Sequence, residues 1–263
     1  IRYRNIYRGS SPNGVPDYPP PAAIIDYYLP DGFDGTVRLE VLDSRGDLVN
    51  AMESTGEEGE DEIVEDMNVS QTRVIADQSL SAKPGMNRFR WNMTHFGAWH
   101  ENEDNRYKGG PMARPGTYRL RLTAGDTTSV QTLNLVTDPR VLAQGTSEQD
   151  IDDQVTFLLV VADLLSEVRQ FEQQLVEEHE DLEARSDELT PDEAARLIVV
   201  TDVLDEVKSK DIIYPQPMLT SQVAYLYRMV NGADQAPGVD AADRLVELNA
   251  WFARVKSQYE SGN

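Results

Sequence analysis

The sequence predicts an α+β protein in two parts: an Ig-like or FnIII-like antiparallel β-sandwich, followed by an antiparallel helical bundle. Three observations support this prediction. As far as about residue 143, apolar residues alternate with period two, which is typical of half-buried strands. From about Thr146 they recur every three or four residues, as on one face of a helix. Turn signals such as Pro115-Gly116 and Asn231-Gly232 separate the periodic segments.

Composition divides the chain into three regions. Residues 1–22 are rich in Arg, Tyr, Gly and Pro, so we expect an extended linker or edge segment. Residues 23–143 are expected to form the β-sandwich domain, with an acidic insertion at 53–66, and residues 144–263 an acidic helical bundle. The first residue is Ile1 rather than Met, so we expect a fragment or a processed product of a longer protein.

The clearest strand signals lie in two segments, 85–93 and 115–122. In the first, one face is predicted to hold Asn87, Phe89, Trp91 and Met93. In the second, the matching face is predicted to hold Tyr118, Leu120 and Leu122. Strands with aromatic inner faces need a second sheet to cover them, which is why we expect a sandwich built around Trp91 and Tyr118.

The remaining elements follow from the same patterns. Further strands are predicted at 23–29, 36–43, 48–52 and 127–136, with an irregular one at 72–75 and a hairpin turn at 44–47. Ser147 is expected to cap a helix that runs to about Ala184. Thr190, with Pro191 and Glu193, predicts a capping box at the start of the second helix. Two more helices are predicted at 219–230 and 240–259.

Charge and composition exclude several classes of function. The chain has 24 basic and 46 acidic residues, a net charge of -22, which argues against nucleic acid as a partner because phosphate binding needs a basic surface. With no cysteine there is no disulfide and no thiol nucleophile. No apolar run reaches about 18 residues, so we expect no membrane span. No motif commits the chain to a reaction, and we expect no catalytic residue, cofactor or metal.

Two acidic segments contain residues that can ligate a metal ion. The insertion Glu53–Asp66 holds eight acids, and we interpret it as a solvated loop rather than a calcium loop because its spacing does not match an EF-hand. The second candidate comprises loop residues His95, His100, Glu101, Glu103 and Asp104. Imidazole and carboxylate can bind zinc, but ligands this close together on a loop usually lack supporting contacts, so we interpret the segment as a polar surface loop.

Four arginines form the strongest candidate interaction site. Arg88, Arg90, Arg119 and Arg121 are predicted to lie on the outward side of two adjacent strands. Like charges on neighbouring strands are unfavourable unless acidic groups cover them. We therefore hypothesise that this arginine ladder docks the helical part, the acidic insertion or a partner chain. The alternative is an exposed sheet face at which Glu40 and water suffice.

Several motifs resemble a known family. The motifs are Pro19-Pro20-Pro21-Ala22-Ala23-Ile24-Ile25-Asp26-Tyr27-Tyr28-Leu29, Gly85–Met93, Pro115–Leu122 and Thr137-Asp138-Pro139-Arg140. Together they resemble the region that follows the propeller in bacterial sortilin-like (VPS10-like) BNR-repeat proteins, which are usually labelled glycosyl hydrolase-like. The segment Pro115–Leu122 is also similar to the Ig-like domain of flagellar hook-capping proteins.

The resemblance implies a non-catalytic accessory region of a secreted or cell-envelope bacterial protein, one that packs against a β-propeller or mediates protein–protein assembly. Two alternatives stay open. One is a carbohydrate-binding module in which aromatic residues stack on sugar, either the loop residues Phe96 and Trp99 or Tyr3, Tyr7 and Tyr18. The other is a subunit of a glycosidase-like enzyme whose active site lies on the propeller.

Overall fold

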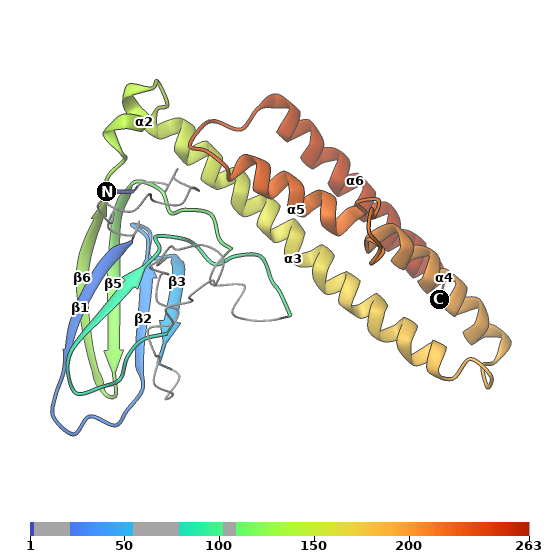
Figure 1. The fold of residues 1–263 in the computed structure, drawn as a ribbon, viewed down its shortest axis with the longest axis horizontal. Helices are drawn as coiled ribbons and strands as arrows, with labels where there is room; N and C mark the ends of the chain where they lie inside the picture. The colour runs from blue at the N-terminus through green and yellow to red at the C-terminus, as the bar shows by residue number, and fades with distance from the viewer. Residues whose placement is uncertain (3–21, 55–78, 102–108, 263) are drawn as a thin grey trace. The chain divides into compact units, whose positions relative to one another are not determined.

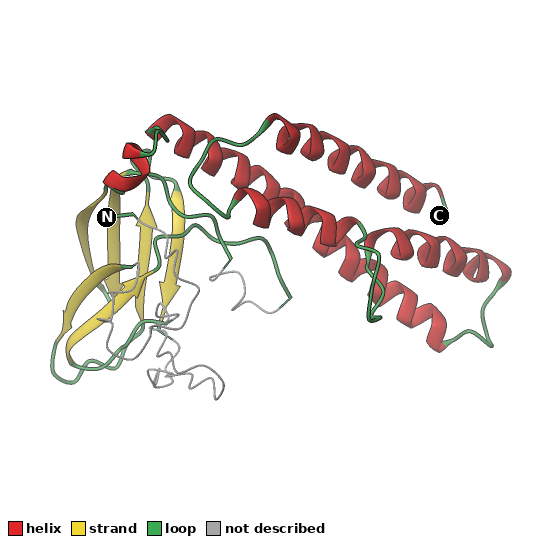
Figure 2. Ribbon diagram, turned by 45° about the horizontal axis from the view of Figure 1, so that its top comes forward, coloured by secondary structure: helices red, strands yellow, loops and turns green. Residues whose placement is uncertain are grey.

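The computed structural model describes residues 1–2, 22–54, 79–101 and 109–262. The chain forms two compact units (Figures 1 and 2). The β unit comprises Ile1–Phe96 and Tyr107–Asp152, and the helical unit comprises Gly97–Arg106 and Asp153–Asn263. The mixture of helices and antiparallel sheets makes the protein α+β.

The described residues of the β unit form six strands in two antiparallel sheets. One sheet pairs β1 (Ala23–Leu29) with β4 (Gly85–Trp91). The other has the order β3-β2-β5-β6. Its strands are β2 (Val37–Leu42), β3 (Leu48–Glu53), β5 (Gly116–Ala124) and β6 (Thr127–Leu135). A short helix that the sequence analysis missed, α2 (Pro139–Ala143), follows β6 and is capped by Asp138.

The two sheets share one apolar core. The period-two alternation predicted the inner face of β4 correctly, because Asn87, Phe89 and Trp91 are buried, and Met93, just after the strand, is buried as well. Strand β2 contributes three fully buried residues, Val37, Leu39 and Val41. From β5, Tyr118 and Leu120 are buried in the same cluster. Burial of these side chains is the main force that holds the two sheets together.

The helical unit is built from α3 (Glu148–Ala184), α4 (Pro191–Val207), α5 (Leu219–Val230) and α6 (Val239–Ser261). The predicted starts of all four helices, and the predicted ends of α3, α5 and α6, are confirmed to within two residues. Ser147 and Asp150 cap α3 reciprocally, through Ser147 N to Asp150 Oδ2 (2.8 Å) and Asp150 N to Ser147 Oγ (3.1 Å). The predicted capping box at Thr190 and Glu193 is confirmed.

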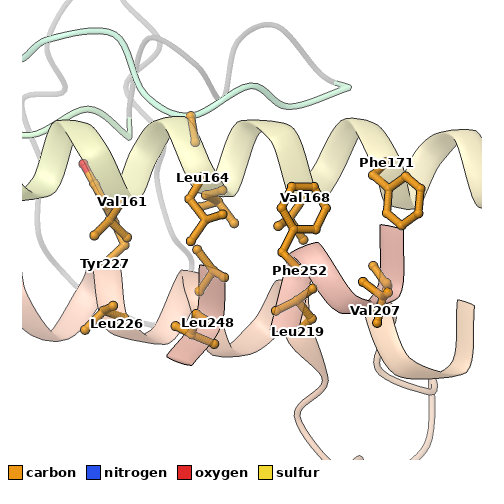
Figure 3. Packing of buried hydrophobic residues seen from close by; sticks show 14 of the residues in the cluster. Val161, Leu164, Val168, Phe171, Val207, Leu219, Leu226, Tyr227, Leu248 and Phe252 are labelled. Atoms are coloured by element: carbon orange, nitrogen blue, oxygen red, sulfur yellow. The ribbon is translucent and has the colours of Figure 1, made fainter. Parts of the chain in front are cut away.

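Apolar side chains from all four helices meet in a second core (Figure 3). Val161, Val168 and Phe171 of α3 face Val207, Leu219, Leu226 and Phe252 of the other three helices. The ring of Phe171 meets the ring of Phe252 edge-on at 5.8 Å. In the described parts of the chain, no helix has an apolar stretch long enough to cross a bilayer.

Candidate interaction surfaces

The outward side of the β1–β4 sheet presents six side chains in three directly opposed pairs. The pairs are Tyr28 with Met86, Asp26 with Arg88, and Ile24 with Arg90. We call these six residues the outer β1–β4 face. They point outward because alternate residues of each strand, such as Tyr27 and Phe89, fill the core. The sequence predicted the outward arginines here but not the exposed apolar residues Ile24, Tyr28 and Met86. Their signal in the sequence is that they occupy strand positions that alternate with core residues.

The centre of this face is an ion pair. Arg88 binds Asp26 with two hydrogen bonds, Nε to Oδ1 at 2.7 Å and Nη2 to Oδ2 at 2.9 Å. These hydrogen bonds lower the pKa of Asp26. Beside the pair, large apolar side chains are open to solvent, with exposed fractions of 56% for Ile24, 62% for Tyr28 and 72% for Met86. Exposed apolar residues that adjoin one another on a regular sheet mark a contact surface more often than singly scattered ones do.

The outward side of the second sheet is more polar. Arg121 Nε lies 2.6 Å from Glu40 Oε2, and Arg38 Nη2 lies 3.5 Å from Glu40 Oε1. The hydrogen bond from Arg121, followed by the charges of both arginines, lowers the pKa of Glu40. Arg119 is exposed two residues before Arg121, and no described residue forms an ion pair with it. Among the described residues of this face, Arg119 therefore offers a charge to a partner.

The prediction of a single arginine ladder is wrong. Strand β4 pairs with β1, and β5 pairs with β2 and β6, so β4 and β5 are not neighbours. Arg88 and Arg90 therefore lie on one sheet, and Arg119 and Arg121 lie on the outward side of the other. The alternation assigned each arginine to the outward side, but it carries no information about which strands pair. Whether either pair docks a partner remains a prediction.

The segment after β4 is not simply a polar surface loop. Ala98 is buried among the apolar side chains of the helical unit. Trp99 N donates a hydrogen bond to Ser166 Oγ (2.9 Å), and Arg169 Nη1 donates one to Trp99 O (3.0 Å). Phe96 belongs to the β unit, where its backbone N–H binds Val49 O (3.2 Å). The two aromatic candidates for sugar binding are therefore half-buried and belong to different units.

His95 is held inside the β unit by backbone pairing. His95 N donates to Pro111 O (2.9 Å), and Ala113 N donates to Met93 O (2.7 Å). A Cβ atom at Gly110 would lie 1.8 Å from His95 O, so only glycine allows this close approach. Burial, followed by the charge of Arg114, lowers the pKa of His95 to about 4. A half-buried imidazole that is neutral at pH 7 has the character of a structural residue.

The metal candidates find no support in the described residues. Among residues 1–2, 22–54, 79–101 and 109–262, no three His, Asp or Glu side chains gather as a metal would require. Glu103, Asp104 and most of the acidic insertion lie outside the described residues, as do Tyr3, Tyr7, Tyr18 and the irregular strand predicted at 72–75.

Comparison with known proteins identifies no relative. No family model matches the chain, and no curated protein or solved structure matches it either.

Proposed function

We propose that this chain is a non-catalytic accessory region of a secreted or cell-envelope β-propeller protein, and that it mediates packing or assembly through the outer β1–β4 face. The observation that carries this proposal is the three opposed pairs of that face, in which tyrosine, methionine, isoleucine and arginine are exposed side by side. Protein–protein interfaces are enriched in these aromatic, Met and Arg side chains.

The proposal includes a finer description of the fold. We infer that the β unit is an Ig-like or FnIII-like β-sandwich and that the helical unit is an antiparallel bundle. Support for the sandwich comes from two antiparallel sheets that share one core. Support for the bundle comes from four amphipathic helices with short connections and a common core.

The composition of the face suggests which residues matter most. Tyr28 and Met86 lie directly opposite each other and offer a large apolar contact area, so they are the expected anchors. The ion pair between Asp26 and Arg88 orients both side chains, and it is expected to contribute specificity more than affinity. That the partner is a β-propeller rests on the resemblance of Pro19–Leu29 and Pro115–Leu122 to the region after the propeller in sortilin-like proteins.

The test is native mass spectrometry of the protein isolated from its source, with the companion chain identified by peptide sequencing. We expect a β-propeller polypeptide to be bound. Tyr28→Ser with Met86→Ser should weaken this complex at least tenfold, since interface anchors contribute about 2 kcal/mol or more. The matched control is Ile198→Ser with Val246→Ser, which removes apolar side chains of similar exposure (63% and 70%) from helices. A lone monomer, or equal weakening by both double variants, contradicts the proposal.

A further inference from the structure

Strand β6 forms an open edge of the four-stranded sheet (Figure 1). It pairs with β5 on one side, and no described strand pairs with it on the other. Residues Thr127–Thr132 are all exposed, although alternate residues of a strand face opposite sides of the sheet. Among the described residues the other sheet consists of β1 and β4, and the exposure of Thr127–Thr132 indicates that these two strands leave the inner side of β6 uncovered over this stretch.

The described residues of this edge lack the sequence features that normally prevent an edge strand from pairing with another chain. Such strands are usually short, or interrupted by lysine, proline or a bulge. Strand β6 has nine residues, TTSVQTLNL, with neither a charged residue nor a proline. Its pairing with β5 runs without a register shift from Ala124–Thr127 to Gly116–Leu135. In the part of the chain that the structure describes, β6 therefore offers a regular edge with none of these interruptions.

The hairpin geometry shows which backbone groups face the open edge. A two-residue turn, Gly125-Asp126, joins β5 to β6, with Gly125 at a φ of 55°. The residues that flank such a turn form a hydrogen-bonded pair, and hydrogen-bonded and non-hydrogen-bonded pairs then alternate. Thr128, Val130, Thr132 and Asn134 therefore direct their N–H and C=O groups away from β5. Val136 follows in the same alternation, and its carbonyl already accepts a hydrogen bond from Arg2 N (2.8 Å).

We propose that the open edge of β6 receives an extended, acidic segment of a partner protein as an additional strand. The outward N–H and C=O groups of β6 form the hydrogen bonds to the added strand, and the positive charge of the neighbouring arginines favours an acidic segment. Arg119 lies opposite Thr132, and Arg121 opposite Val130, so both arginines share the outward side with these β6 residues. Strands are spaced about 4.8 Å apart, so the new strand lies about 10 Å from β5. An arginine side chain from β5 and a glutamate side chain from the new strand can together span this distance.

A second copy of this chain fits the edge less well. Its own β6 has no acidic side chain to place near Arg119. An acidic segment of another protein meets the exposed Arg119 instead. This inference rests on the proposed function and deepens it, because it names the class of partner and a second contact surface.

The experiment uses the full chain and a synthetic nine-residue peptide in which threonine and glutamate alternate. We expect binding by fluorescence anisotropy, together with slower amide hydrogen exchange in Thr127–Leu135. A lysine-for-glutamate peptide should bind at least tenfold more weakly. A glutamate peptide that is N-methylated at alternate residues should also bind at least tenfold more weakly, because its backbone cannot form hydrogen bonds along β6. This peptide control is independent of the folding of any variant.

Protein variants test the two contributions separately. Val130→Pro removes an N–H from the open edge and should lower the affinity at least tenfold, whereas Val130→Thr keeps the N–H and should stay within twofold. Arg119→Ser should lower the affinity for the glutamate peptide about two- to fivefold, which is typical of an exposed ion pair. Arg45→Ser, in the 44–47 turn, is the control and should leave this affinity unchanged.

Three results would overturn the inference. The first is absence of binding at about 1 mM peptide. The second is equal binding of the N-methylated peptide, since charge alone would then explain the association. The third is a concentration-dependent dimer that protects β6, which would make a second copy the occupant. If β6 fails these tests while Tyr28→Ser with Met86→Ser still releases the propeller chain, the proposed function stands without this surface.

Discussion

The indole of Trp91 meets the ring of Tyr118 edge-on, with 6.0 Å between ring centroids and 66° between ring planes. The two residues belong to different sheets, since Trp91 ends β4 and Tyr118 lies in β5. Their contact crosses the core that the sheets share. The hydroxyl of Tyr118 donates to Arg114 O (2.8 Å), and burial raises the pKa of Tyr118 to about 12. This pair is therefore one of the contacts that join the two sheets.

We predict that Trp91→Ala destabilises the β unit by about 3–5 kcal/mol, because it removes a large buried ring and leaves a cavity. Urea unfolding, followed by amide hydrogen exchange in β2 and β5, measures the change. Tyr28→Ala is the control, since Tyr28 is exposed, and it should cost no more than about 0.5 kcal/mol. If the two variants unfold at the same urea concentration, Trp91 does not anchor the core.

Thr190→Ala should destabilise the helical unit by about 1 kcal/mol. Thr190 Oγ1 accepts a hydrogen bond from Glu193 N, and the Glu193 carboxylate accepts from Thr190 N at 2.8 Å. Alanine removes the side-chain half of this capping box. The midpoint of urea unfolding followed in α4 is the measurement, and Thr190→Ser should restore most of the loss. An unchanged midpoint in Thr190→Ala would show that α4 does not depend on its cap.

Glu193 should make the stability of the helical unit sensitive to acid. Hydrogen bonds from the backbone and side chain of Thr190, followed by one from Arg185, lower the pKa of Glu193 from 4.5 to about 2. A carboxyl group whose pKa is lower in the folded state contributes stability above its unfolded pKa, and that stability disappears as pH falls. We expect the loss between about pH 4.5 and pH 2. Unfolding free energies measured across this range should fall less steeply in Glu193→Gln than in Glu180→Gln.

His95 should produce a pH dependence of stability in the β unit. Its pKa of about 4 in the folded protein lies below the ordinary value of 6.5, so the unfolded state binds the proton first as pH falls. Stability contributed by the neutral imidazole is complete above about pH 6.5 and decreases toward pH 4. NMR titration of the imidazole should give a midpoint near 4. His95→Gln should remove this part of the pH dependence, whereas His179→Gln, on α3, should leave it in place.

Arg196→Ala should cost the helical unit about 2 kcal/mol, because it leaves a partly enclosed carboxylate without its cation. Arg196 Nε lies 2.6 Å from Glu178 Oε1, and its guanidinium lies 4.0 Å over the ring of Tyr259. Tyr259 also donates its hydroxyl to Glu178 Oε2 (2.6 Å). Thermal and urea unfolding measure the cost. The exposed ion pair of Lys210 with Asp205 provides the comparison, and Lys210→Ala should change stability by no more than about 0.5 kcal/mol.

The local elements were largely predictable because their signals lie close together in the sequence. Period-two alternation placed Phe89 and Trp91 in the core, and period 3.6 did the same for most of the apolar face of α3. The capping box at Thr190 was readable from three neighbouring residues. The five-residue helix α2 was missed because it is too short to show a period, although Asp138-Pro139 is a start signal.

The candidate surfaces were less predictable because they depend on contacts between distant segments. All four arginines were expected on outward positions, yet no signal in the sequence shows that β4 pairs with β1 and β5 with β2 and β6. The hydrogen bond from Trp99 to Ser166 joins residues 67 positions apart, and Ala98 is buried among side chains of the helices. Neither could be inferred from a segment that reads as a polar loop.

The sequence by itself therefore determined where most elements begin and end, and which side of each strand or helix is apolar. Propensity, capping and periodicity act over a few residues, so they can be read from a single chain. Only the tertiary structure decided which strands are neighbours, and therefore which side chains form the outer β1–β4 face and why β6 is left at an edge. Strand pairing follows from how distant apolar surfaces bury one another, and many pairings satisfy the same alternation.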